Sequence, residues 1–463
     1  MTAFQIEPIL SQLEAALATR DIPRAWQLVA PLSAARTQDP RVGSVWLTML
    51  RITPARESLV AEATEILEQW PADNSLQLLG CDALIRAAEL VAPDVPVSDA
   101  GAAVKAIEVA EKNLARLSAA ERSDKAIGGY WLMNQANALR LAHRFPDAEG
   151  AYDQALALDP KNGDWWFNFG LLHKASGDFV LALAATQKAA ELLGERRGVL
   201  WNIALCATAL GQGKLAADTM RKLGFNAVVL ESGMPYVEGL PPLQVRIATR
   251  GSGHGYAGPE LDSSVLFELV WVSPASPFHG VVQTPTFREG SVDYGDLVLW
   301  DGTPVGMTEH EGKATPRFAL LSKLRDGGER RFRFIALEQD EGDVARCAAE
   351  LPEPVQMFMQ RAHVEMLCPR CASGDHMHKH THQTPEPHRL VYGKLIVPGD
   401  LELRAFQAGF TEYVRKHPKV QFVIPALLEA LGDTQGAGKA HQLWRGLERT
   451  SEKRDASFKA RRS

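Results

Sequence analysis

Residues 166–194, WFNFGLLHKASGDFVLALAATQKAAELLG, decide the fold of the N-terminal half. Two large residues are followed by a small one, then a glycine turn, and then a second helical run with alanines at its contact points. Small residues where two helices cross allow their backbones to approach closely, so this stretch predicts a pair of packed helices. The pattern is carried by Trp166, Phe169, Gly170, Gly177, Phe179, Ala182 and Ala189.

The same pattern recurs 34 residues earlier and 34 residues later. Three units in register predict stacked helical hairpins over about 129–225. The earlier unit has Leu132, Gln135, Ala136, His143, Phe145, Ala148, Tyr152, Ala155 and Pro160; the later one has Leu200, Ile203, Ala204, Gly211, Gly213, Ala216 and Leu223.

This period and these residue types resemble the tetratricopeptide repeat (TPR) family, whose unit is two antiparallel helices with small residues where they cross. The sequence departs from the family at Gln135, Gly213 and Gly194, where an apolar residue, an aromatic residue and a proline are usual. The resemblance implies a superhelical solenoid that binds other proteins. Fainter helical pairs upstream predict five or six hairpins over 1–225, although an unrelated helical bundle before three repeats is also consistent with the pattern.

Asparagines recur at one position in the first helix of each clear repeat, at Asn134, Asn168 and Asn202. In the TPR family such an Asn commonly lies on or beside the concave groove, where it can bond the backbone of an extended peptide. Arg140 and Lys174 follow almost two turns later and could receive an acidic or C-terminal carboxylate group. These five residues are the candidate peptide-binding site. Alternatively, the asparagines cap or bridge neighbouring helices.

From about Asn226 strand-like segments replace the helical pattern, and helices return after about residue 400. This order predicts an α+β domain over 226–435. The Asp301-Gly302 dipeptide and the run Asp326–Gly328 each predict a hairpin turn. Residues 436–463 form a basic C-terminal tail, interpreted as a solvated helix with a frayed end.

A cysteine and histidine cluster lies between residues 363 and 388, which hold six of the thirteen histidines. The pair Cys368 and Cys371 has the spacing of a zinc knuckle, and alternating histidines place several imidazoles on one side of an extended segment. Zinc prefers these donors, so a Cys2His2 zinc site is the favoured reading. Its candidate ligands are Cys368, Cys371, His376, His378, His380 and His382.

Three other readings of this cluster stay open: adventitious metal binding by a histidine-rich tract, a dithiol redox pair, and a surface role without metal. A structural zinc is favoured over a catalytic one, because neither Glu365 nor Asp375 belongs to a known catalytic signature. His-Val-Glu at 363–365 lacks the rest of a zinc deaminase pattern.

Composition excludes several classes of protein. The net charge of −6 argues against a nucleic-acid binder, and five cysteines in 463 residues exclude a disulfide scaffold. No signal peptide and no continuous apolar span is recognisable, so a cytoplasmic protein is expected. The sequence favours an interaction or adaptor protein with a zinc-stabilised C-terminal domain. Alternatives are a metal-dependent enzyme that recruits a protein substrate through its repeats, and a metal-trafficking protein.

Overall fold

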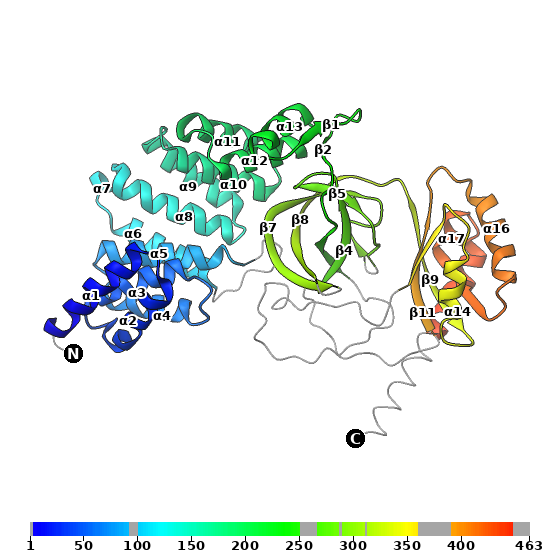
Figure 1. Cartoon of the computed structure of the whole chain (residues 1–463), viewed down its shortest axis with the longest axis horizontal. Helices are drawn as coiled ribbons and strands as arrows, with labels where there is room; N and C mark the ends of the chain where they lie inside the picture. Colours follow the sequence, from blue (N-terminus) through cyan, green and yellow to red (C-terminus); the bar gives the residue numbers. More distant parts are fainter. Residues whose placement is uncertain are drawn as a thin grey trace, which may run out of the picture. The chain divides into compact units, whose positions relative to one another are not determined.

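The structure is a computed structural model of the chain and describes residues 3–91, 101–250, 266–286, 289–310, 313–359 and 390–447 (Figure 1). The chain divides into two compact units, Met1–Phe225 and Asn226–Ser463. The first is helical where described and the second contains sheets, which confirms a helical half followed by a sheet-containing region. The cysteine and histidine cluster and residues 448–463 of the basic tail lie outside the described residues.

Helices of unit 1 follow one another in hairpins joined by short turns. The three clear repeats are the pairs α8 with α9, α10 with α11 and α12 with α13. The elements are α1 (Ala3–Ala18), α2 (Ile22–Val29), η1 (Ala30–Ala35), α3 (Pro40–Ile52), α4 (Leu59–Gln69), α5 (Asn74–Ala88), α6 (Ala102–Arg116), α7 (Ala119–Ser123), η2 (Lys125–Gly129), α8 (Tyr130–Leu141), α9 (Phe145–Leu158), α10 (Gly163–Ser176), α11 (Phe179–Leu193), α12 (Arg197–Ala209) and α13 (Gly213–Lys222).

Alanines of the 34-residue register lie where the paired helices touch. A methyl group placed on Gly170 would lie 2.6 Å from the Thr186 hydroxyl, so α10 and α11 approach closely only because residue 170 has no side chain. One hydrophobic core runs from Leu13 in α1 to Leu172 in α10, so the upstream helices pack continuously with the repeats. The fully buried register alanines are Ala136, Ala148, Ala155, Ala182, Ala189, Ala204 and Ala216.

The turn inside each clear hairpin requires a left-handed backbone. Gly177 and Gly211 have φ of 85° and 68°, and His143 occupies the equivalent position with φ of 59°. A side chain makes this conformation costly, by roughly 1–2 kcal/mol. His143 therefore carries backbone strain that the two glycines avoid.

Replacing His143 by glycine is expected to raise the free energy of unfolding of unit 1 by about 0.5–1 kcal/mol, because the strain relieved exceeds the extra chain entropy lost on folding. Urea denaturation of the full chain, followed by circular dichroism, measures the change. The opposite variant Gly177→Ala should lower stability by about 1 kcal/mol. A less stable His143→Gly chain would contradict the argument and show that the stacking of His143 on Phe145 outweighs the strain.

Unit 2 begins with a small two-stranded sheet, β1 (Ala227–Val229) with β2 (Pro235–Val237), and continues into a larger one. The larger sheet has the strand order β4-β5-β7-β8-β3-β6. Because β3 also pairs with β4, the first five strands of this order form a closed barrel. Its core is formed mainly by buried valines together with Trp300. Its strands are β3 (Leu243–Arg250), β4 (Leu266–Pro274), β5 (His279–Val282), β6 (Glu289–Gly290), β7 (Leu297–His310) and β8 (Lys313–Arg325).

Both predicted hairpin turns are wrong. Asp301-Gly302 lies within β7, where Trp300 pairs with Leu320 and Pro304 with Phe318, so the dipeptide belongs to a bulge that absorbs extra residues. Asp326–Gly328 connects β8 to β9 (Arg330–Glu338), and these strands belong to different sheets.

A third sheet, of four strands, has the order β10-β11-β9-β12, with β9 antiparallel to both neighbours. Helices cover one of its faces through a core that includes Phe334, Phe406 and Phe410. The predicted return of helices after about residue 400 is confirmed by Leu403–Arg415 and Pro425–Ala430. The remaining elements are β10 (Gln356–Met359), β11 (Leu390–Val397), β12 (Val420–Val423), α14 (Asp343–Ala349), α16 (Leu403–Arg415) and α17 (Pro425–Ala430).

Candidate functional site

An open pocket of about 550 Å³ lies in unit 1, and residues of α3, α5, α8 and α10 line it. Of these, α5, α8 and α10 each open a hairpin, so one face of successive repeats forms the pocket. The lining combines apolar side chains with polar ones. The wall is made by Leu78, Leu79, Tyr130, Met133 and Trp165, and the polar lining by Arg51, Ser75, Asp82, Asn134, Asn137, Asp164 and Asn168.

Three amide side chains share this pocket. The Asn137 Oδ1 accepts a hydrogen bond of 2.6 Å from the Tyr152 hydroxyl, which fixes the orientation of that amide. Burial raises the pKa of Tyr152, so its hydroxyl stays protonated as a donor. The Asn168 Nδ2 donates to the Asp164 carbonyl at 2.9 Å. Its Oδ1 is left as an acceptor for an N–H donor of a ligand. Asn134 lies half-buried beside them.

Of the five residues predicted to bind peptide, two line this pocket. Asn134 and Asn168 line the pocket together, whereas Asn202, Arg140 and Lys174 do not. Asn202 is 7% exposed and its Nδ2 donates to the Gly198 carbonyl at 2.9 Å, as Asn168 does one repeat earlier.

Both predicted cations are largely enclosed by their own unit. The Arg140 side chain is 11% exposed, and its guanidinium lies 3.8 Å from the Glu89 carboxylate. Lys174 is 9% exposed. Neither presents an open cationic surface to the pocket.

Sequence reasoning missed the aromatic part of the pocket. The rings of Tyr130 and Trp165 meet edge to face with centroids 5.9 Å apart, and a methyl group on Gly129 would lie only 2.5 Å from the Trp165 ring. Trp165 follows Trp131 by 34 residues, one position before the register residues Leu132 and Trp166. That repeated tryptophan is the signal that could have identified the site.

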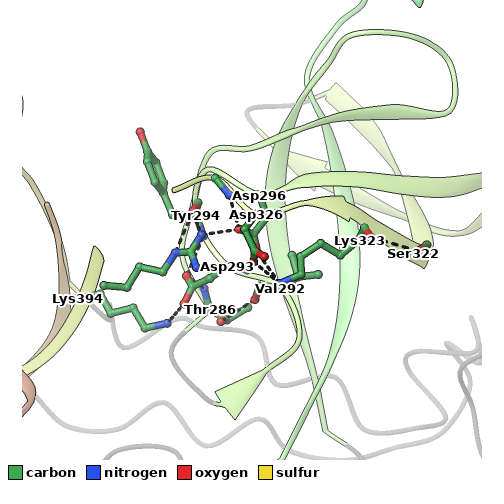
Figure 2. Close-up of polar contacts among 11 residues, drawn as sticks. Thr286, Val292, Asp293, Tyr294, Asp296, Ser322, Lys323, Asp326 and Lys394 are labelled. Atoms are coloured by element: carbon green, nitrogen blue, oxygen red, sulfur yellow. Dashed lines mark hydrogen bonds and ion pairs between the residues drawn. The ribbon is translucent and has the colours of Figure 1, made fainter. Parts of the chain in front are cut away.

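A second polar cluster joins the two larger sheets of unit 2 (Figure 2). Lys394 of β11 pairs with Asp293, and Arg331 of β9 pairs with Asp296; both aspartates lie between β6 and β7. Burial lowers the pKa of Lys394, and the Asp293 carboxylate opposes that shift. The buried Asp296 and the half-buried Asp293 each pair with a base, so these ion pairs link the two larger sheets.

A buried serine and histidine pair lies in the turn between β4 and β5. The Ser276 hydroxyl is 2.6 Å from the His279 Nδ1. Burial lowers the pKa of His279 to about 4, so the ring is neutral at pH 7. Both residues are almost fully buried, at 0% and 1% exposure, and a substrate cannot reach them without rearrangement of the turn.

The predicted zinc ligands Cys368, Cys371, His376, His378, His380 and His382 lie outside the described residues. Among the residues that the structure does describe, no group of three or more His, Cys, Asp or Glu side chains could hold a metal ion. The cysteines that the structure describes, Cys81, Cys206 and Cys347, are buried. Burial raises the pKa of Cys81 and of Cys347, which disfavours the reactive thiolate.

Across these same described segments, no helix has both the length and the apolar character needed to cross a membrane.

No protein-family model matches the chain, and no curated protein matches its sequence. Two solved structures, described as "Crystal structure of MamA" and "Crystal structure of MamA protein", are similar to part of it, with sequence identities of 16% and 14%. The similarity covers 35% and 41% of this chain and 83% and 90% of theirs, with a TM-score of 0.27 in both cases. Likenesses of this size carry no argument about function.

Proposed function

We propose that unit 1 is a protein-interaction module of the TPR type and that its pocket binds an extended peptide segment of a partner protein. The observation that carries the proposal is the set of three amides, Asn134, Asn137 and Asn168, gathered beside the Tyr130 and Trp165 rings. The 34-residue repeat that places Asn134 and Asn168 on one face supports it.

The chemistry of the pocket suits a peptide backbone. An extended chain presents alternating N–H and C=O groups. Asn137 keeps its Nδ2 as a donor, Asn168 keeps its Oδ1 as an acceptor, and Asn134 supplies a donor and an acceptor to match them. A peptide side chain that leaves water for the apolar wall adds favourable burial. A volume of about 550 Å³ is in the range of pockets that hold small ligands, and accommodates a few residues of a peptide.

Replacing Asn134 and Asn168 together by alanine is expected to weaken peptide capture about tenfold, because each lost hydrogen bond to a backbone costs roughly 0.5–1.5 kcal/mol. The probe is a phage-displayed library of random peptides selected on the full chain. Affinities of selected peptides are then measured by fluorescence polarisation, and thermal melting checks that the fold is intact.

Asn202→Ala is the matched control, since Asn202 occupies the same repeat position outside the pocket. It should leave affinity unchanged. Failure to enrich any peptide over the Asn134→Ala, Asn168→Ala chain would overturn the proposed function. An equal loss of affinity in the Asn202→Ala chain would contradict the assignment of peptide binding to this pocket.

A structural zinc ion in the C-terminal unit is a further part of the proposal and rests on the sequence alone. Cys368, Cys371 and two of the four alternating histidines supply its donors. The segment that contains them connects β10 to β11, which are antiparallel neighbours in one sheet. A cytoplasmic location, equally a proposal from the sequence, would keep these thiols reduced and able to bind metal.

Cys368→Ser with Cys371→Ser is expected to abolish stoichiometric zinc, as measured by inductively coupled plasma mass spectrometry of the purified chain. A chelator should lower the melting temperature of the unaltered chain but not that of the variant. Unchanged zinc content in the variant would refute the ligand assignment. Zinc that is lost without any effect on melting would refute the structural role and favour the metal-dependent enzyme.

A further inference from the structure

We propose that the pocket of unit 1 selects peptides in which a long aliphatic or aromatic side chain lies next to a lysine or arginine. This inference rests on the proposed function and goes beyond it by assigning the charge and the anchor of the ligand. It differs from the acidic or carboxylate ligand that the sequence suggested.

The anchor follows from the wall of the pocket. Met133 and Trp165 are buried, with 3% and 4% of their surface exposed, while Tyr130 is 52% exposed, and all three line the pocket. An exposed tyrosine ring beside a buried tryptophan offers apolar surface that a ligand side chain can cover. Burying a leucine- or phenylalanine-sized side chain there contributes roughly 1.5–3 kcal/mol.

The charge follows from the polar lining. Asp82 and Asp164 come from different helices, α5 and α10, and the lining contains one cation, Arg51. The Arg51 guanidinium is 3.2 Å from Oδ2 of Asp82 and so already offsets that carboxylate. Asp164 is paired through Oδ1 with Arg196, which is not part of the lining. The lining groups carry one net negative charge, which Arg196 offsets from outside the lining. Because the Asp164 and Arg196 side chains are 67% and 58% exposed, their ion pair is weak, and a ligand cation can compete with Arg196 for the carboxylate.

Tyr130 adds a second reason for a basic ligand. The face of an exposed aromatic ring attracts an ammonium or guanidinium group within about 6 Å. Tyr130 lines the same pocket as Asp82 and Asp164, so its ring adds to the attraction of a bound cation. Arg140 and Lys174, the groups expected to receive an acidic ligand, are enclosed and lie outside the pocket lining.

The test selects phage-displayed random peptides on the full chain and on the Asp82→Asn, Asp164→Asn chain. Peptides enriched on the unaltered chain should pair a large apolar residue with an adjacent Lys or Arg. Their affinity should fall about fivefold or more when both carboxylates are neutralised, and should fall with added salt. Asp218→Asn is the matched control, because Asp218 is also ion-paired on a helix of unit 1 but lies outside the pocket.

The outcomes separate this inference from the proposed function. Enriched peptides that are acidic, or whose affinity is the same after neutralisation of Asp82 and Asp164, would overturn the inference. If those peptides still lose affinity in the Asn134→Ala, Asn168→Ala chain, the peptide-binding function stands without its charge preference. Dependence on the carboxylates with no loss in the Asp218→Asn chain would support it.

Discussion

Replacing Asp296 by alanine is expected to lower the free energy of unfolding of unit 2 by about 3–5 kcal/mol, because the change leaves buried partners without their acceptor. The Asp296 side chain is 1% exposed and its Oδ1 pairs with Arg331. The same carboxylate accepts hydrogen bonds of 2.9 Å from the backbone N–H groups of Gly327 and Asp293. Removing the carboxylate therefore removes an ion pair between the two larger sheets and the hydrogen bonds that hold two loops.

Hydrogen exchange of the full chain, read by mass spectrometry on peptides from β7 and β9, measures this loss locally. Asp326→Ala is the matched control. Asp326 also pairs with Lys323, at 2.6 Å, but its side chain is 74% exposed, so its loss should change stability by less than about 0.5 kcal/mol. Equal effects of the two variants would contradict a special role for the buried carboxylate.

The helical half was predictable because its signal is local and repeated. Ala136, Ala182 and Ala204 lie at helix contacts, where the 34-residue register put them. The strands of unit 2 were partly recognisable, but their pairing was not. Pairing depends on residues far apart in the chain, as with Gln244 and Arg317, so turn dipeptides alone assigned the wrong partners.

The difference between local and long-range signals also explains which site residues were predictable. Periodicity brought Asn134 and Asn168 to one face, because repeat position determines direction. It could not show that Arg140 lies against Glu89, which comes from another hairpin, or that Lys174 is buried. The pairing of Asp293 with Lys394 spans 101 residues and leaves no local pattern in the sequence.

Trp165→Ala is expected both to destabilise unit 1 and to remove peptide binding. Loss of a buried tryptophan leaves a cavity and costs about 3–5 kcal/mol of stability. It also removes the wall on which Tyr130 packs, so affinity for the selected peptides should fall about thirtyfold or more, as at an interface hot spot.

The equivalent residue one repeat earlier separates these two effects. Trp131 is 0% exposed and its indole N–H donates to the Asn74 Oδ1 at 3.0 Å, but it does not line the pocket. Trp131→Ala should therefore destabilise the unit by a similar amount while the folded fraction keeps its affinity. Urea denaturation gives both stabilities, and fluorescence polarisation at low temperature, where both variants are folded, gives the affinities. If the Trp131→Ala chain lost as much affinity, the effect of Trp165 would be one of folding, and the pocket wall would have no specific part in recognition.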